Sequence, residues 1–184
     1  MSFKKKLIVI VGMPGSGKAM ASRVARDLGY PVLVCGDVIR EEAKKRGLPP
    51  TPENIGILML KIRQEEGRAV VACRLIPEIQ AQCSNVVVVE GARNVEELDE
   101  LRRHFDVQTL AIHASPSTRF SRLKSRNRSD DPRNWNEFIV RDQREIDVGI
   151  DRLIATANRM IVNEGSIREF KISVSKLLKE MCSK

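Results

Sequence analysis

The chain has 184 residues, of which 42% are hydrophobic and 30% charged, and its formal net charge is +8. This length and composition are typical of one folded domain with a full hydrophobic core, and they exclude a disordered or fibrous chain. No apolar stretch is long enough to span a membrane. Aromatic residues make up only 4% of the chain, which argues against a surface that stacks nucleic-acid bases. We therefore expect residues 1–184 to form a single domain whose partners include neither a membrane nor a nucleic acid.

The N-terminus resembles the start of a signal peptide, because three lysines at positions 4–6 precede an apolar run. That run, Leu7–Val11, is short and leads directly into a glycine-rich segment, so we interpret it as a strand. The four cysteines form no C-x-x-C pair, and no histidine stands at metal-ligand spacing from them. We expect a cytoplasmic protein with reduced thiols.

A glycine-rich segment with the sequence Gly-Met-Pro-Gly-Ser-Gly-Lys follows this first strand at residues 12–18. A predicted helix over 20–28 comes next. A strand, a glycine-rich turn and a helix in this order predict a phosphate-binding loop, whose free backbone N–H groups and helix N-terminus attract anionic oxygens. A chance glycine-rich turn is disfavoured because both flanks match. We expect ATP to be bound by Gly12, Met13, Pro14, Gly15, Ser16, Gly17, Lys18 and Ala19, with Lys18 also catalytic.

The remaining apolar runs predict strands over 31–35, 85–89, 107–113 and 160–162. Helix-start signals separate them: Asn94 before Glu97, Ser115-Pro116, and Ser166 before Glu169. Strands that alternate with helices predict a three-layer α/β P-loop NTPase fold, with a five-stranded parallel sheet and helices on both faces. Ligands of such sheets bind at the carboxyl ends of the strands.

Two stretches depart from simple alternation and divide the domain into parts. Residues 37–84 hold three helical segments, the last of which carries Pro77 and is expected to kink or split there. The polar stretch 126–145 is interpreted as a short lid. The core then consists of residues 1–36, 85–125 and 146–184, and the helical insertion 37–84 lies beside the phosphate loop.

Charged clusters follow the ends of the second, third and fourth strands, near the phosphate loop. Phosphoryl transfer needs positive charge around the moving group, a metal ion, and in-line placement of donor and acceptor. Arginine suits phosphate because its planar guanidinium binds two oxygens at once. The carboxylates of Asp37 and Glu90 are the candidates to organise Mg²⁺, directly or through water.

In these motifs the chain resembles a P-loop nucleoside monophosphate kinase of the adenylate kinase type, with features of dephospho-coenzyme A kinases. It most resembles an archaeal family of adenylate-kinase-related proteins, over nearly the whole chain. The Gly36-Asp37-x-x-Arg40 and Glu90-Gly-x-Arg93 segments resemble those that bind the acceptor phosphate, which implies substrate binding by Asp37, Arg40 and Arg93. The segment Arg122-Leu-x-x-Arg126 resembles a lid hinge that binds donor phosphates, and Arg128-x-Asp-Asp a motif near the lid exit. The resemblance thus implies catalytic roles for Arg122, Arg126 and Arg128.

The sequence also departs from the family pattern. Ala19 and Met20 stand where a metal-binding hydroxyl commonly follows the lysine. Glu90 replaces the usual aspartate in a motif that is one residue shorter, and the lid is brief. Two other classes of protein therefore stay open: an ATP-binding regulator with little catalysis, and a nucleic-acid-binding ATPase.

Each arginine also has a purely structural interpretation. Arg40 can pair with Glu41 or Glu42, and Arg93 with Glu96 or Glu97. Arg122 and Arg126 fit a solvated helix nearly as well as a binding site. We favour an ATP-dependent kinase whose acceptor is a phosphate-bearing nucleotide or nucleotide-like molecule, with Mg²⁺ as its metal.

Overall fold

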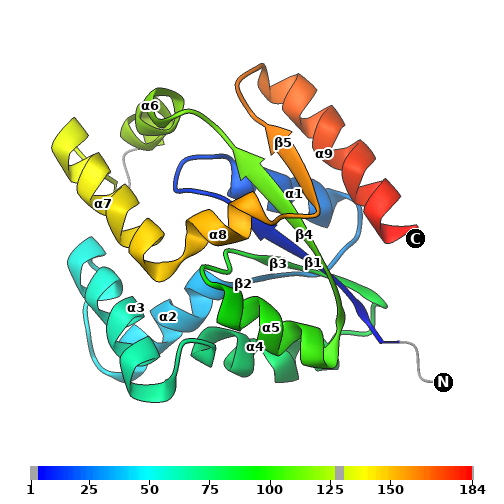
Figure 1. Ribbon diagram of the computed structural model, residues 1–184, viewed down its shortest axis with the longest axis horizontal. Helices are drawn as coiled ribbons and strands as arrows, with labels where there is room; N and C mark the ends of the chain where they lie inside the picture. Colours follow the sequence, from blue (N-terminus) through cyan, green and yellow to red (C-terminus); the bar gives the residue numbers. More distant parts are fainter. Residues whose placement is uncertain (1–3, 127–130, 184) are drawn as a thin grey trace.

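The computed structural model describes residues 4–126 and 131–183, and within them it confirms a five-stranded sheet (Figure 1). The strands are β1 (Lys6–Val11), β2 (Val32–Val34), β3 (Val86–Glu90), β4 (Asp106–His113) and β5 (Arg159–Val162). Their order is β2-β3-β1-β4-β5, and every neighbouring pair is parallel. Because β1 is central, its carboxyl end places the glycine-rich loop at the middle of the sheet edge where ligands of such folds bind.

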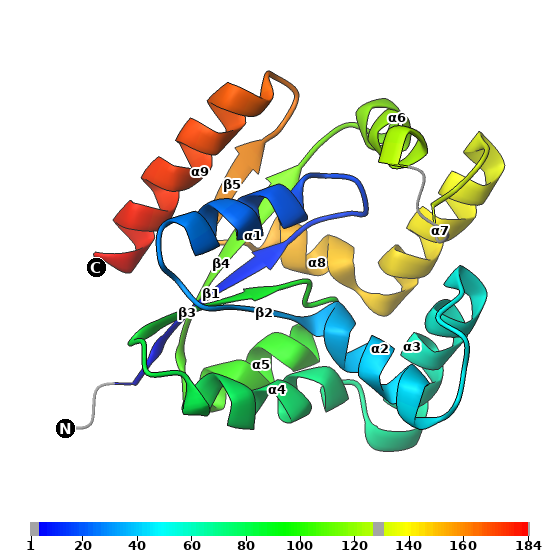
Figure 2. The same ribbon diagram turned by 180° about the vertical axis from the view of Figure 1, so that it is seen from behind.

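Helices cover both faces of this sheet, as the alternating pattern predicts. On one face lie α1 (Lys18–Asp27) and α9 (Ile167–Cys182), and on the other α4 (Val70–Ala81), α5 (Val95–His104) and α8 (Ile150–Ala155). The insertion adds α2 (Cys35–Lys45) and α3 (Pro52–Glu66) to the side of the second face. Helices α6 (Pro116–Arg126) and α7 (Trp135–Val148) lie beyond the carboxyl ends of the strands, as both views show (Figures 1 and 2).

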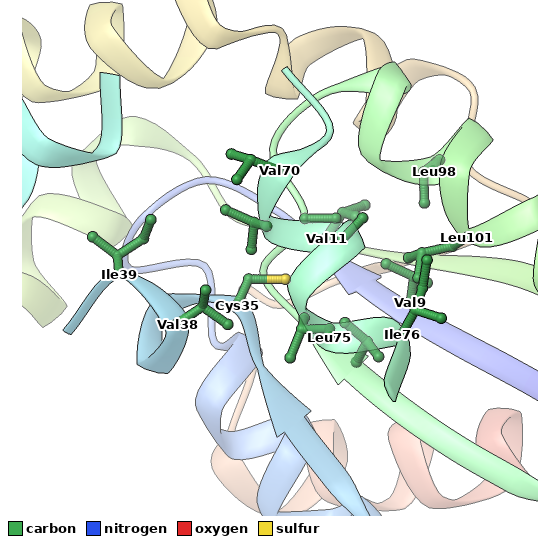
Figure 3. Close-up of a cluster of buried hydrophobic side chains, with 14 of the residues drawn as sticks. Val9, Val11, Cys35, Val38, Ile39, Val70, Leu75, Ile76, Leu98 and Leu101 are labelled. Atoms are coloured by element: carbon green, nitrogen blue, oxygen red, sulfur yellow. The ribbon is translucent and has the colours of Figure 1, made fainter. Parts of the chain in front are cut away.

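The core consists of two apolar clusters, one on each side of the sheet. Side chains of β1 alternate between them: Leu7 and Val11 belong to the cluster under α4 and α5, and Ile8 and Ile10 to the cluster under α1 and α9. All four are fully buried. Figure 3 shows the first cluster, in which residues of α2 and α4 contact those of β1 and α5. A strand buried on both faces explains why its sequence is continuously apolar.

The expected break at Pro77 does not split the helix, because α4 continues from Val70 through Pro77 to Ala81. Proline inside a helix removes one backbone hydrogen bond and costs roughly 3 kcal/mol. Tertiary burial offsets this cost, since Val71, Leu75 and Ile79 of α4 are at most 2% exposed. At this position packing overrides the local preference of the chain.

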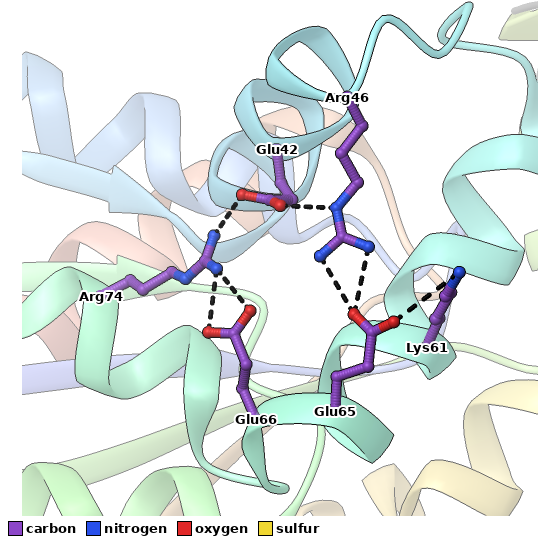
Figure 4. Close-up of polar contacts among 6 residues, drawn as sticks. All are labelled: Glu42, Arg46, Lys61, Glu65, Glu66 and Arg74. Atoms are coloured by element: carbon purple, nitrogen blue, oxygen red, sulfur yellow. Dashed lines mark hydrogen bonds and ion pairs between the residues drawn. The ribbon is translucent and has the colours of Figure 1, made fainter.

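An ion-pair network joins the three helices of the insertion (Figure 4). The Glu42 carboxylate accepts hydrogen bonds from Arg46 Nε and Arg74 Nη1, both at 2.6 Å. Arg46 also pairs with Glu65, and Arg74 with Glu66. The hydrogen bond from Arg46, followed by that from Arg74, holds the pKa of Glu42 below its usual value. The network thus ties α2, α3 and α4 together as one unit.

The stretch 126–145, interpreted as a lid, carries most of α7, and this helix continues past residue 145 to Val148. Phe138, fully buried, contacts Trp135 and Phe120, with ring centroids 5.0 and 5.5 Å away. This aromatic cluster joins α7 to α6. Trp135 and Phe138 thus pack α7 against α6.

Candidate active site

The glycine-rich loop is held so closely by its neighbours that only glycine fits at three positions. Gly12, Gly15 and Gly17 have φ angles of 152°, 80° and 114°, which L side chains rarely adopt. A Cβ at Gly12 would lie 2.3 Å from the Ile112 carbonyl oxygen, and one at Gly15 would lie 2.7 Å from that of Arg119. The loop thus packs between the end of β4 and helix α6, and Gly12, Gly15 and Gly17 also line a cavity.

Lys18 lies under this loop and contacts its backbone. Its Nζ donates hydrogen bonds to the carbonyl oxygens of Gly12 at 2.6 Å and Met13 at 3.1 Å. Burial lowers the pKa of Lys18 to about 8, although the nearby Glu90 and Glu145 carboxylates raise it. A negatively charged ligand would stabilise the ammonium form that burial disfavours. The loop and its lysine therefore suit an anion such as a polyphosphate.

A cavity of about 330 Å³ opens between the loop and the surrounding helices. Its charged lining consists of six cations and two carboxylates: Lys18, Arg40, Arg93, Arg122, Arg126 and Arg141, against Glu90 and Glu145. A formal excess of four positive charges in a concave site attracts anionic ligands. Most residues predicted for the site lie on this wall. Six of the eight predicted loop residues are among them: Gly12, Pro14, Gly15, Gly17, Lys18 and Ala19.

Three predicted residues do not line the cavity. Met13 contributes its carbonyl to Lys18, and Ser16 is fully buried behind the loop. Asp37 is exposed and pairs with Arg40, one turn further along α2. Arg40 therefore forms its ion pair with Asp37, and not with Glu41 or Glu42 as considered from the sequence. Arg128 lies outside the described residues.

Glu90 ends β3 and faces the loop from the neighbouring strand. Its Oε2 accepts a hydrogen bond at 2.6 Å from the hydroxyl of Ser22, a fully buried residue one turn after Lys18. Ala19, which replaces the usual hydroxyl residue, is exposed and lines the cavity. Among the described residues, no three His, Cys, Asp or Glu side chains gather closely enough to hold a metal ion. A metal here needs oxygen ligands from a bound phosphate and from water as well as from Glu90.

Arg93 is held from two sides. Its backbone N–H donates to Glu97 Oε2 at 2.7 Å, and its Nε lies 2.8 Å from Oε2 of Glu145 on α7. Its side chain therefore pairs with neither of the partners considered from sequence, Glu96 and Glu97. Glu97 instead pairs with Arg63 in a buried contact.

Two arginines of α6 reach opposite parts of the site. Arg122 Nη2 donates to the Asn163 carbonyl at 2.9 Å, and its Nη1 lies 3.5 Å from the Ser16 carbonyl, so it joins the loop to the turn after β5. Arg126 pairs with both carboxylate oxygens of Asp131, whose side chain is 2% exposed. Both arginines line the cavity, so neither is merely part of a solvated helix face.

Three residues of this region were not predicted from the sequence: Arg119, Asp142 and Glu145. Arg119 is 4% exposed, forms a two-oxygen pair with Asp142, and donates to the Pro14 carbonyl at 3.2 Å. Glu145 lines the cavity beside Arg93. The sequence did carry a signal for Asp142 and Glu145. Together with Phe138 they follow helical spacing and form one buried face of α7.

Comparisons with known proteins agree with this fold. Residues 11–138 match a family model described as an AAA domain. A UPF0200 protein of Pyrococcus abyssi is 42% identical over 180 residues, which covers 95% of this chain and 96% of the relative. Among solved structures, a shikimate kinase from Aquifex aeolicus aligns with a TM-score of 0.55 at 18% identity, over 94% of this chain and 96% of that one. A gluconokinase from Sinorhizobium meliloti aligns with a TM-score of 0.58, also at 18% identity, over 97% and 94%.

The fold and its glycine-rich loop define a P-loop kinase-like α/β protein. Within that class the chain belongs to the UPF0200 family, which the Pyrococcus relative represents over nearly its full length. The expected resemblance to an archaeal family of kinase-like proteins is thereby confirmed. None of the described helices is long and apolar enough to cross a bilayer.

Proposed function

We propose that this protein is an ATP-dependent small-molecule kinase that transfers the γ-phosphoryl group to a phosphate-bearing nucleotide or nucleotide-like acceptor. The observation that carries the proposal is the cavity, which joins a phosphate loop on β1 and α1 to arginines from four other parts of the chain. A site that only stored a nucleotide needs no second set of cations across from its phosphate loop. Two groups of cations suit two phosphate-bearing ligands held together for transfer.

The donor side of the proposed site comprises the loop, Lys18 and the α6 arginines. Arg122 contacts the loop backbone through Ser16, and Arg126 lines the same cavity. Guanidinium groups in this position stabilise the negative charge that spreads over the moving phosphoryl group. The acceptor side comprises Arg40 and Arg93, which follow β2 and β3. In this proposal Asp37 supports Arg40 through their ion pair.

In this proposal Mg²⁺ binds beside Glu90, whose carboxylate lines the cavity. Glu90 would hold the ion, largely through water, and Ser22 would orient that carboxylate through its hydrogen bond. Asp37 is less suited to contact the metal directly because it does not line the cavity. When bound, Mg²⁺ supplies neutralising charge to the phosphates.

Replacing Glu90 with glutamine is expected to raise the Mg²⁺ concentration needed for half-maximal activity, because one carboxylate charge near the ion is lost. Binding of ATP without metal is expected to stay intact. Titration of activity against Mg²⁺, beside calorimetry of metal-free ATP, measures both quantities. An unchanged Mg²⁺ dependence would exclude Glu90 from this role.

Replacing Arg40 or Arg93 with alanine is expected to impair use of the acceptor while ATP affinity stays nearly unchanged. Loss of one charge-assisted contact costs about 1.5–3 kcal/mol, or about ten- to over a hundred-fold in kcat/KM. Lysine variants should recover only part of the loss, because an ammonium keeps the charge without the planar fork. Steady-state kinetics with varied acceptor checks this. If both alanine variants lose ATP affinity instead, the donor and acceptor sides are reversed.

One observation favours a second candidate function, an ATP-binding regulator. Ala19 offers no oxygen to a metal at the position where P-loop proteins commonly carry a hydroxyl. A screen of nucleoside monophosphates and hydroxy acids with ATP and Mg²⁺ separates the two functions. ATP binding together with turnover of at least one acceptor supports the kinase, and ATP binding with no turnover supports the regulator.

A further inference from the structure

Glu145 is a buried carboxylate in a cavity that otherwise favours anions. It comes from α7, is 5% exposed and lines the cavity. Its Oε2 lies 2.8 Å from Nε of Arg93, yet this buried atom accepts no hydrogen bond from any described residue. A buried acceptor that receives no hydrogen bond is less favourable than the same oxygen hydrated in water. The site therefore contains an oxygen that a ligand bearing a hydrogen-bond donor would satisfy.

The surroundings of Glu145 place it at the centre of the proposed reaction. Glu90, Glu145, Arg93 and Arg141 line the same cavity as Lys18. The two carboxylates raise the pKa of Lys18, and the two arginines lower it. In P-loop proteins this lysine binds the phosphates next to the group that is transferred. Glu145 thus faces the space between the phosphate loop and the acceptor-side Arg93.

Glu90 and Asp37 are the other two carboxylates predicted for the site. Glu90 accepts a hydrogen bond from the hydroxyl of Ser22. Asp37 pairs with Arg40 and lies off the cavity wall. Of the two described carboxylates on that wall, Glu145 is the one with a buried oxygen that accepts no hydrogen bond from a described residue, although that oxygen is ion-paired with Arg93.

The two possible kinds of attacking group make different demands on such a carboxylate. A phosphate acceptor is already anionic, so it needs no base and is repelled by a nearby carboxylate. A hydroxyl acceptor must lose a proton as it attacks, and a positioned carboxylate can take it. A buried glutamate between the phosphate loop and Arg93 favours the second kind.

We propose that Glu145 is the general base for an alcohol acceptor, a small molecule that carries an anionic group for Arg40 and Arg93 and reacts through a hydroxyl. This inference rests on the proposed kinase function and specifies the group that attacks the γ-phosphorus, a hydroxyl and not a phosphate oxygen. The hydroxyl oxygen forms a bond to the γ-phosphorus while the bond from that phosphorus to the β,γ-bridging oxygen breaks. The proton passes to the Glu145 carboxylate and then to solvent. The products are a phosphate monoester and ADP.

The experiment uses the full chain with ATP, Mg²⁺ and two sets of probes. One set contains five nucleoside monophosphates, and the other contains shikimate, gluconate and glycerate. Phosphorus NMR of the products distinguishes a new monoester, formed at a hydroxyl, from a new diphosphate, formed at a phosphate. The proposal expects monoester products only, whichever probe reacts.

Glu145→Gln is expected to lower kcat by about 10²–10⁴-fold, the usual range for general base catalysis, with ATP affinity unchanged by calorimetry. Glu145→Asp should recover part of the rate because it restores the base. Asp147→Asn is the matched control, since Asp147 is an exposed carboxylate on the same helix that bonds Gln143. It should leave kcat within a factor of two or so.

Three results would overturn the proposal: a diphosphate product, a Glu145→Gln variant as active as Asp147→Asn, or ATP binding without transfer to any probe. If Glu145 merely positioned Arg93, the glutamine variant would raise the acceptor KM and leave kcat intact, which also contradicts it. If the unmodified protein did not bind ATP, the kinase assignment on which the proposal rests would itself be refuted.

Discussion

Replacing Lys18 with alanine is expected to weaken ATP binding by at least about 1.5–3 kcal/mol, the size of a hydrogen bond to a charged group. This corresponds to a rise in Kd of about ten- to over a hundred-fold. The reason is that Lys18 supplies a full positive charge under the loop, where burial excludes the water that would screen it. Isothermal titration calorimetry with ATP measures the change directly.

The Lys18 variant should bind poorly without being unfolded. Burial holds the pKa of Lys18 near 8, below its usual value, so at neutral pH the protonated lysine opposes folding and its removal should not lower the Tm. Lys171→Ala is the matched control, since Lys171 is an exposed lysine on α9. Equal ATP affinity in the two variants would remove the phosphate-loop assignment.

Replacing Arg119 with alanine is expected to lower the free energy of unfolding by about 3–5 kcal/mol, because Asp142 would be left as an uncompensated buried charge. Arg119 and Asp142 are 4% and 8% exposed, with 2.8 and 2.5 Å between their paired atoms. The arginine also lies over the Phe138 ring, with its Cζ 5.0 Å from the ring centroid. Urea denaturation of the variant and the unmodified protein measures the loss.

Two further variants test whether burial of the Arg119–Asp142 pair causes the expected loss of stability. Arg103→Ala removes an exposed pair with Glu100 on α5 and should cost less than about 1 kcal/mol. The double variant Arg119→Met with Asp142→Leu replaces both buried charges by apolar groups and should recover most of the stability. If Arg119→Ala cost no more than Arg103→Ala, the pair would not be buried in solution.

The order of helices and strands was predictable because local patterns encode it. The continuously apolar run at Leu7–Val11 indicates a strand buried on both faces, and the structure has β1 there. Asn94 and Ser166 were expected to begin helices, and both accept the hydrogen bond from the third residue that such caps require. Pro77 was the exception, since its local effect was outweighed by burial of the helix that contains it.

The candidate site was predictable in part, for the same reason. Lys18, Arg93 and Arg122 follow strand ends or lie one helix away, and parallel strands bring their carboxyl ends to one edge. The pairing of these residues was not predictable. The Arg93 side chain pairs with Glu145, which is 52 positions away in the chain, and not with the carboxylates three and four positions away.

By itself, then, the sequence determined what depends on neighbouring residues: the phosphate loop, the parallel sheet and the set of cations directed at its edge. These features follow from periodicity, capping and glycine spacing, which act over a few residues. Only the tertiary structure decided which charges meet. Arg119 with Asp142 and Arg93 with Glu145 depend on how α7 packs over the strand ends. Such contacts join residues far apart in the chain, so their energies depend on distance and burial, which no local pattern records.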